Sequence, residues 1–292
     1  MKISAKTKKI TAALASLLAI VSMSSCVIRA KINIEDMGPV KKGNFELKQE
    51  AVTDKLNVNV NLAVANFSIK RGNQFCVNYN IPQKLIPDVN VNGNTITIDG
   101  QEDARSKSLS IENIDDLWNI GEDGSDSFKV ELVIPQDMEI NDIDLSLRIG
   151  VIRLNAINFN DIAAEINLGD CILSDLTCSV METDIDLGDV KLKEVTCTSV
   201  DVDNSLSDIR VESVVCSTVD VAVELGDVKI TGIKCESINV DAESGDIDVS
   251  GDYAKINASA GVGDITINTD RPEKDVEIKV SVDLGKTKIN KK

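Results

Sequence analysis

The strongest constraint in this sequence is a unit of about 19 residues that repeats through the second half of the chain. Four consecutive copies of 19 residues each open on an aspartate, and slightly shorter copies follow. The copies open at Asp170, Asp189, Asp208, Asp227, Asp246 and Asp264, and a weaker copy precedes them from Val151. A fixed period of about 20 residues is typical of a solenoid, in which each unit stacks on the next.

Aligned copies share columns of apolar side chains with polar residues between them. The second, fourth, seventh, twelfth and usually the eighteenth positions are apolar, and the alternation within segments has a period of two. This period indicates β-strands, and no helical spacing persists over a useful window. We expect all five columns to point inward, including Leu168, Leu187, Leu206 and Leu225 of the eighteenth column. The sequence predicts an all-β fold: a single-stranded parallel β-solenoid (β-helix) with coils of about 19 residues, stacked about 4.8 Å apart.

The repeat also predicts how the chain is divided. We expect residues 137–285 to form the β-solenoid and residues 51–136 to form an N-terminal antiparallel β region that caps it. Within this cap, Asn92-Gly93 between alternating runs predicts a hairpin, and the acidic stretch 101–127 predicts a polar insertion. A cap is expected because an open solenoid end exposes unpaired strand edges.

The sequence predicts that both ends of the chain lie outside the solenoid and its cap. Residues 1–26 combine a basic start, a short apolar run and small residues before Cys26, which is the pattern of a bacterial lipoprotein signal peptide. Cys26 would then be the first mature residue and the site of lipid attachment, with an ordinary signal peptide or an uncleaved anchor as alternatives. We expect residues 27–50 to form a tether and residues 286–292 to form a basic tail. The mature chain would be extracytoplasmic and anchored to the bacterial cell membrane.

Several motifs resemble those of a known family. The LGDV and SGDI corners, the ELVIP strand that ends at Pro135 and the NVNVNLA strand that begins at Asn57 are similar to the bacterial "putative adhesin" β-solenoid family, as is the leader. The resemblance spans residues 56–284. It implies an exported or membrane-attached protein, and some members are linked to envelope-stress responses. The family has no agreed catalytic motif, so the resemblance supplies no catalytic residue.

The composition argues against most enzyme classes. The chain has no histidine, which excludes Ser-His-Asp and Cys-His catalysis and removes the commonest zinc ligand. P-loop, GxSxG and dinucleotide-binding signatures are absent. Coils of constant length also lack the long loops from which solenoid enzymes build a cleft. We therefore expect no catalytic activity and no cofactor, with a carbohydrate-active β-helix enzyme as a remote alternative.

A row of cysteines occupies the ninth position of successive copies. We expect Phe159 before the row and Ala254 after it, both apolar, so the column should point inward. Parallel stacking keeps the Cβ atoms too far apart for an unstrained disulfide, so the favoured interpretation is a ladder of buried free thiols. Strained disulfides between coils and capture of a soft metal are the alternatives. The ladder comprises Cys178, Cys197, Cys216 and Cys235.

Two sets of carboxylates stand out. The first set comprises the aspartates that open the copies, each of which follows a corner: Asp170, Asp189, Asp208, Asp227, Asp246 and Asp264. We expect each to bond the turn backbone and pair with nearby Lys191, Arg210 or Lys229, with a calcium site as the alternative. The opposing strands carry an acidic wall without a basic column. Its weak calcium candidates are Asp184, Asp186, Asp201 and Asp203, although a solvated acidic face is the favoured interpretation.

The net charge of −17 argues against nucleic acid as a partner and is compatible with basic partners. The favoured hypothesis is a non-enzymatic, lipid-anchored cell-envelope protein, an adhesin or scaffold that presents an acidic solenoid surface. The alternative is an envelope-stress sensor that binds cationic peptides or a membrane partner. Besides the membrane, the expected partners are therefore an envelope protein or a cationic peptide.

Overall fold

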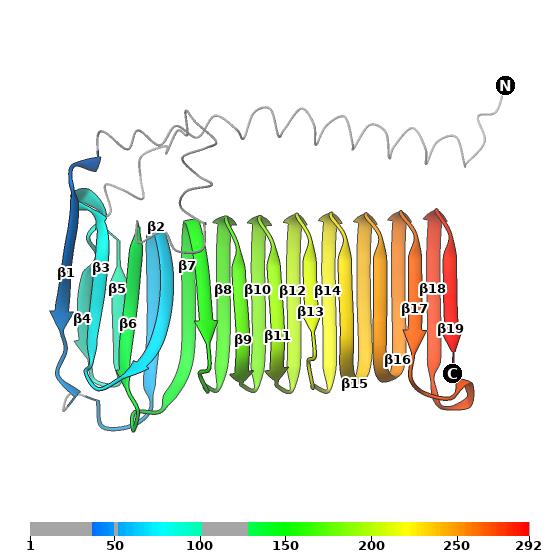
Figure 1. Ribbon diagram of the computed structural model, residues 1–292, viewed down its shortest axis with the longest axis horizontal. Helices are drawn as coiled ribbons and strands as arrows, with labels where there is room; N and C mark the ends of the chain where they lie inside the picture. Colours follow the sequence, from blue (N-terminus) through cyan, green and yellow to red (C-terminus); the bar gives the residue numbers. More distant parts are fainter. Residues whose placement is uncertain (1–36, 50–51, 101–127, 292) are drawn as a thin grey trace.

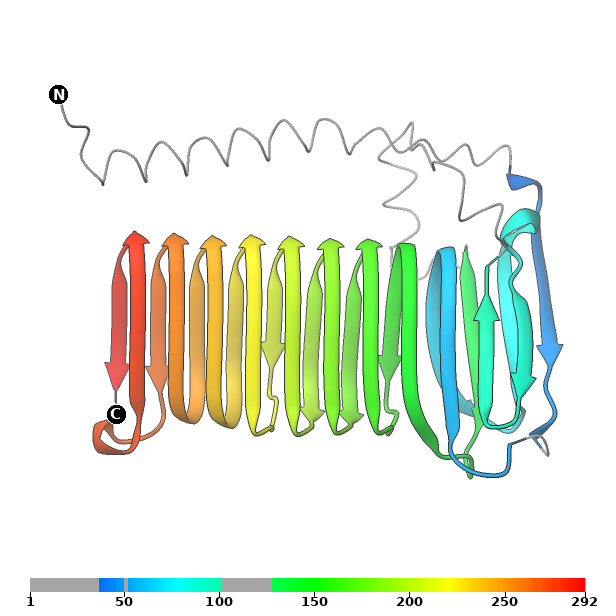
Figure 2. The same ribbon diagram turned by 180° about the vertical axis from the view of Figure 1, so that it is seen from behind.

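The computed structural model describes residues 37–49, 52–100 and 128–291, which form one elongated, flattened β-solenoid (Figure 1). The predicted leader, Cys26 and the insertion at 101–127 lie outside the described residues. The coils follow one another in sequence order from an N-terminal cap to the C-terminal strands at the opposite end, and the view from behind shows the same order (Figure 2).

Strands make up about three quarters of the described chain. The N-terminal part contains β1 (Val40–Glu46), β2 (Leu56–Gly72), β3 (Cys76–Pro82), the short 3-10 helix η3 (Gln83–Leu85), β4 (Asp88–Asn92), β5 (Thr95–Asp99) and β6 (Lys129–Pro135). The coils contain β7 (Ile140–Asn155), β8 (Asp161–Leu168), β9 (Cys171–Thr177), β10 (Val180–Leu187), β11 (Val190–Thr196), β12 (Ser199–Leu206), β13 (Ile209–Glu212), β14 (Thr218–Leu225), β15 (Val228–Ser244), β16 (Ile247–Val262), β17 (Ile265–Thr269), the 3-10 helix η4 (Glu273–Asp275), β18 (Glu277–Leu284) and β19 (Thr287–Lys291).

Each coil places one strand segment in each of two parallel stacks. Stack 1 contains β8, β10, β12, β14, the second halves of β15 and β16, and β18. Stack 2 contains β9, β11, β13, the first halves of β15 and β16, β17 and β19. Equivalent residues of successive copies pair directly, as Val200 does with Val219 in stack 1 and Val190 with Ile209 in stack 2. The predicted parallel β-solenoid with coils of about 19 residues is confirmed.

The core lies between the two stacks and consists of the predicted inward columns. Val190, Leu192, Val195 and Val200, which represent the second, fourth, seventh and twelfth positions, are at most 1% exposed. No single coil can bury these side chains alone, so neighbouring coils supply the contacts that stabilise each other.

The prediction for the eighteenth column is wrong, because its leucines do not enter the core. Leu187 is 38% exposed, and Leu168, Leu206 and Leu225 are only half-buried. Each of these leucines ends a strand of stack 1, immediately before the chain turns into stack 2. The inward-outward alternation of a strand no longer applies at that turn, so the leucine side chain lies along the edge of the solenoid.

A glycine at this edge is required by the close approach of successive coils. Gly188 has a φ of +143°, and a Cβ atom there would overlap the carbonyl oxygen of Gly169 in the preceding coil. One corner differs, because Ser207 stands where the other copies carry glycine. Its hydroxyl donates a hydrogen bond to the Gly188 carbonyl, and the buried Asn204 amide donates to the Ser207 hydroxyl over 2.6 Å. The exception is therefore accompanied by a buried polar residue in the core.

A second column has left-handed backbone without a consistent residue type. The column lies in the stack 2 segments of five successive coils and consists of Ala156, Asp175, Glu194, Ser213 and Gly232, with φ between 53° and 64°. Only the last of the five is glycine, the residue that adopts this conformation with least strain. The repeated geometry therefore belongs to the coil and is imposed on whatever residue occupies the position.

The N-terminal end is closed by antiparallel strands, as predicted. β3 pairs antiparallel with both β1 and β6, and β4 forms an antiparallel hairpin with β5 across Asn92-Gly93. The parallel stacking begins before residue 137, because β2 pairs in parallel with β7. β1 lies within the predicted tether and β19 within the predicted basic tail. Both segments contain alternating residues that complete the adjacent sheet.

Among the described residues, no helix has the length and apolar character needed to cross a membrane.

Candidate binding surfaces

The outward side of stack 1 carries a continuous set of carboxylates, which we call the acidic face. All of its acidic side chains are exposed, and none forms an ion pair with a lysine or arginine among the residues that the structure describes. The acidic face comprises Glu182, Asp184, Asp186, Asp201, Asp203, Asp220, Glu224, Asp241 and Glu243. Negative charge on this surface is therefore not neutralised by the described part of the chain.

Stacking places like charges directly opposite one another on the acidic face. Asp201 pairs in register with Glu182 on one side and Asp220 on the other, and Asp184 pairs with Asp203. Partial burial, followed by the charges of Asp220 and Glu182, raises the pKa of Asp201 above its ordinary value. Partial burial, followed by the charge of Asp203, raises the pKa of Asp184. Like charges across neighbouring strands are destabilising, so a cation bound here would relieve that repulsion.

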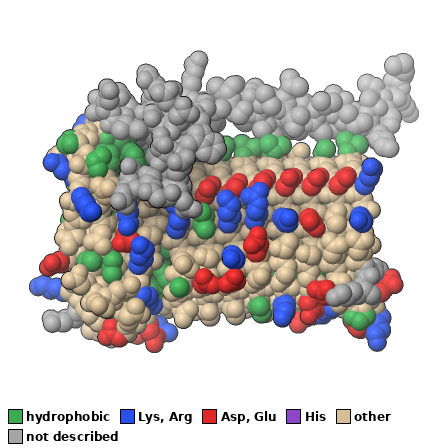
Figure 3. Space-filling view, in the orientation of Figure 1, with side chains coloured by type: hydrophobic (Ala, Val, Ile, Leu, Met, Phe, Trp, Pro, Cys, Tyr) green, Lys and Arg blue, Asp and Glu red, His purple; other side chains and the backbone are tan. Residues whose placement is uncertain are grey.

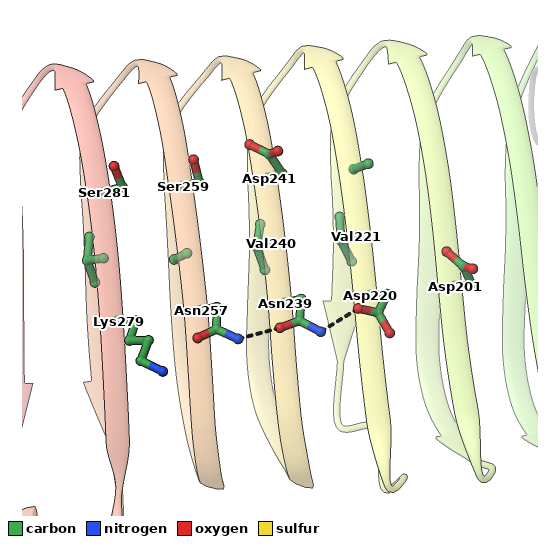
Figure 4. Close-up of a pocket in the computed structure, with 13 residues that line it drawn as sticks. Asp201, Asp220, Val221, Asn239, Val240, Asp241, Asn257, Ser259, Lys279 and Ser281 are labelled. Carbon is green, nitrogen blue, oxygen red and sulfur yellow. Dashed lines mark hydrogen bonds between the residues drawn. The ribbon is translucent and has the colours of Figure 1, made fainter.

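The acidic face leads into a shallow groove of about 550 Å³ over β14, β15, β16 and β18. The groove is hollow because small outward side chains, such as Ala222 and Ser259, replace longer ones. Along its floor, Asn257 donates to Asn239 over 2.7 Å, and Asn239 donates to Asp220 over 2.5 Å (Figure 4). Lys279 lies in the same row beyond Asn257, so the charge changes from negative to positive along the groove.

The calcium candidates are on the acidic face but do not form a cage. Asp184 and Asp186 lie on β10, and Asp201 and Asp203 lie on β12. Within the described ranges, no group of three or more Cys, His, Asp or Glu side chains is arranged to hold a metal ion. Strand pairing spreads the carboxylates over a plane, whereas calcium needs several oxygens around one point.

The corner aspartates form a ladder at the start of the stack 2 segments. The carboxylate of each aspartate accepts a hydrogen bond from the backbone N–H one coil further on, as in the 3.0 Å bond from Asp189 to Asp170 and the 2.7 Å bond from Asp264 to Asp246. Equivalent bonds join the other members and end at Lys286. Arg210 also binds the carboxylates of Asp208 and Asp189, at 2.8 and 3.2 Å. Adjacent rows of acidic and basic side chains are visible on the solenoid in Figure 3.

The four cysteines of the ninth column stack as a ladder where stack 2 segments turn into stack 1. Neighbouring residues pair in register on both sides of the column, as Thr177 does with Thr196 and Val180 with Ser199. All four thiols are free. Cys178 and Cys235 are buried, but Cys197 and Cys216 are only half-buried, which corrects the expectation that the whole ladder is buried. The column lies where the strands end, and its two central thiols are partly exposed to solvent.

Aromatic residues close the thiol ladder at both ends. Phe159 precedes Cys178, as predicted, and Tyr253 follows Cys235 in the strand register. The prediction of Ala254 at that place is wrong, because the strand register shifts by one residue between β15 and β16. Phe159 is 7% exposed and Tyr253 is fully buried. Water therefore reaches the thiols through the middle of the ladder.

The thiols interact with one another along the ladder. Side-chain hydrogen bonds with Cys178 and Cys216 hold the pKa of Cys197 below its ordinary value. The same bonds raise the pKa of Cys178 and Cys216, because a thiol that donates to a neighbouring thiolate retains its own proton. Cys171, in the core, is different: burial, followed by the charge of Asp170, raises its pKa to about 12.

Comparison with known proteins follows from this geometry. A family model described as Toastrack DUF4097 matches residues 53–290, which include β2 and the strands from β3 to β18. The chain belongs to the Toastrack family. No curated protein matches the chain.

Solved structures are similar to this chain at low sequence identity. A "putative adhesin" from Parabacteroides merdae is 12% identical with a TM-score of 0.55, and the match covers 89% of this chain and 98% of that one. A "putative adhesin" from Bacteroides fragilis is 16% identical with a TM-score of 0.44, covering 86% and 97%. A "putative lipid binding protein" from Parabacteroides distasonis is 16% identical with a TM-score of 0.44, covering 87% and 98%. The P. merdae structure supports the fold assignment and nothing finer.

Sequence reasoning missed the groove in this Toastrack protein. Asn239, Asn257 and Lys279 occupy the same stacked row as Asp201 and Asp220. Aligned copies would have revealed that this row changes from acidic to amide to basic. The hollow itself depends on the neighbouring small side chains, which carry no charge signal.

Proposed function

We propose that this chain acts by binding rather than by catalysis: it is an adhesin-like protein of the bacterial cell envelope whose acidic face binds a basic partner. A lipid at Cys26 would hold it outside the cytoplasm. The observation that carries this proposal is the acidic face, in which nine exposed carboxylates have no ion pair among the described residues. The structural likeness to the P. merdae protein shows only the fold, but its printed name, "putative adhesin", agrees with the surface role that we propose.

A rigid sheet with stacked carboxylates fits an extended cationic ligand. The strand interval of about 4.8 Å repeats along the solenoid, so a lysine-rich or arginine-rich segment lying across the strands meets three successive carboxylates at Glu182, Asp201 and Asp220. The raised pKa values of Asp184 and Asp201 indicate repulsion that a cationic ligand would relieve. Charge complementarity of this kind gives an association that weakens with salt.

The test is calorimetric titration of the full chain with a lysine-rich peptide at low and physiological salt. The double variant Asp201→Asn/Asp203→Asn removes two charges from the acidic face, and Glu212→Gln/Asp248→Asn removes two charges from stack 2 as a matched control. At about 0.7 kcal/mol for each exposed pair, the first variant is expected to bind about tenfold more weakly, and the control is expected to bind like the wild type. Equal weakening in both variants would show that only net charge matters and would reject the acidic face as the site.

A further inference from the structure

The thiol ladder is not used by the proposed function, and its geometry points to a metal site. From the stacking of four free thiols we infer that Cys178, Cys197, Cys216 and Cys235 bind soft monovalent metal ions of the Cu(I) class, each held in a two-coordinate S–metal–S bridge between successive coils. Thiolate sulfur is the ligand that such soft ions prefer in proteins.

The interval between the rungs suits a bridging ion. Successive cysteines are separated by one strand spacing of about 4.8 Å. Two metal–thiolate bonds of about 2.3 Å end to end span about 4.6 Å. A linear S–metal–S unit therefore fits between adjacent rungs without moving the backbone.

The same geometry disfavours the other outcomes for these thiols. Disulfides have Cβ atoms about 3.5–4.5 Å apart, whereas parallel in-register strands keep the Cβ atoms of the ladder near the strand spacing. A four-coordinate zinc site needs sulfurs around one point, and no group of three or more Cys, His, Asp or Glu within the described ranges is arranged to hold a metal ion. Two-coordinate bridging is the arrangement left for a straight row of sulfurs.

Access and protonation are consistent with uptake. The half-buried Cys197 and Cys216 give an ion a route to the middle of the ladder, and Phe159 and Tyr253 shield its ends. In each binding event both sulfurs bind as thiolates, the ion forms one bond to each sulfur, and any proton that either sulfur still carries is released to solvent with no change of oxidation state.

The ladder makes a sharp prediction because two variants can remove the same number of thiols from it. Cys178→Ser/Cys235→Ser retains the adjacent central pair and is expected to bind one ion. Cys197→Ser/Cys216→Ser leaves two thiols three intervals apart, about 14 Å, and is expected to bind none. Wild type is expected to bind at least two ions, and Cys76→Ser/Cys171→Ser, whose thiols lie outside the ladder, is expected to match it.

The experiment is an anaerobic titration of the reduced full chain and these variants with Cu(I) in competition with a chromophoric chelator. Circular dichroism checks that each variant retains β-structure, and X-ray absorption of the loaded protein is expected to show two sulfur ligands per copper. Binding by Cys197→Ser/Cys216→Ser at the wild-type level would overturn the proposal, as would loss of all binding in Cys178→Ser/Cys235→Ser. Wild type that binds no copper and whose mass shows paired, oxidised cysteines would also overturn it, in favour of disulfides between coils.

Discussion

Glu194 lies in a column of left-handed backbone whose equivalent residue two coils later is Gly232. The φ angles are 55° and 64°, respectively. A residue with a Cβ atom is destabilised by about 1–2 kcal/mol in this region, whereas glycine loses about 0.5–1 kcal/mol more backbone entropy on folding than alanine. The difference predicts that Glu194→Gly raises the free energy of unfolding by about 0.5–1 kcal/mol.

Two further variants separate this backbone effect from side-chain effects. Glu194 forms an exposed ion pair with Lys193 at 3.6 Å, and such pairs contribute at most about 1 kcal/mol. Glu194→Ala removes the ion pair but keeps the strained backbone, so it is expected to be neutral or slightly destabilising. Gly232→Ala is expected to lower the free energy of unfolding by about 0.5–1 kcal/mol. No steric overlap contributes there, because the nearest atom to the new Cβ is the Ser213 Oγ at 3.5 Å.

The measurement is equilibrium unfolding in urea, followed by far-ultraviolet circular dichroism and compared through the transition midpoints at constant slope. We expect Glu194→Gly to have a higher free energy of unfolding than wild type, and Glu194→Ala to have the same free energy of unfolding as wild type or a lower one. If Glu194→Gly is less stable than Glu194→Ala, the left-handed column carries no strain and the argument fails.

Four other changes test separate parts of the structure. Gly188→Ala places a Cβ atom on a backbone carbonyl of the neighbouring coil and is expected to destabilise by more than about 3 kcal/mol, measured by the same unfolding assay; a neutral result would contradict the close approach at the corner. Asn204→Val combined with Ser207→Gly restores the pattern of the other coils and is expected to raise the free energy of unfolding by about 1–3 kcal/mol, because the buried Asn204 Oδ1 has no hydrogen-bond partner. A double variant less stable than wild type would show that the Asn204–Ser207 pair stabilises the fold. The pKa of Asp201 lies above its ordinary 3.8 in the folded chain, so the folded state holds the proton more tightly and the free energy of unfolding rises as the pH falls through the raised pKa towards 3.8. Asp201→Asn is expected to reduce this rise and to stabilise the chain at neutral pH by about 0.5 kcal/mol. A pH profile of stability that Asp201→Asn leaves unchanged would argue against carboxylate repulsion. Cys26→Ala is expected to abolish incorporation of a labelled fatty acid in cells, and undiminished labelling would contradict the lipid site.

The repeat made the coils predictable because one residue pattern recurs under one physical constraint. Val190, Leu192 and Val195 and their equivalents alternate with polar residues, and an apolar column in a stack of identical coils has only the interior in which to be buried. The hairpin at Asn92-Gly93 was predictable for a local reason, since these two residues favour a tight turn.

Features at the ends of strands were harder to predict, because alternation does not extend through a corner. Leu187 satisfies the apolar pattern but lies on the edge, and Cys197 belongs to an apolar column but is only half-buried. Tyr253, rather than the expected Ala254, lies next to Cys235 because the strand register shifts by one residue between β15 and β16. The shift changes which residue pairs with Cys235, and the aligned copies give no sign of it. The groove depends on the absence of bulk at Ala222 and Ser259, which becomes evident only when neighbouring coils are placed side by side.

Because of the edge glycines, the solenoid can become longer or shorter only by whole coils. At the glycine corners a carbonyl of the preceding coil occupies the space that a side chain would need, and at the exception Ser207 the side chain bonds that carbonyl. One coil therefore follows another only when it brings its corner at the same phase. A duplication or deletion of one whole 19-residue unit preserves every corner and changes the reach of the protein by about 4.8 Å. Any other insertion within a coil breaks that phase and must be extruded as a loop. Genetic variation in this chain can therefore adjust the length of the solenoid only in steps of one coil.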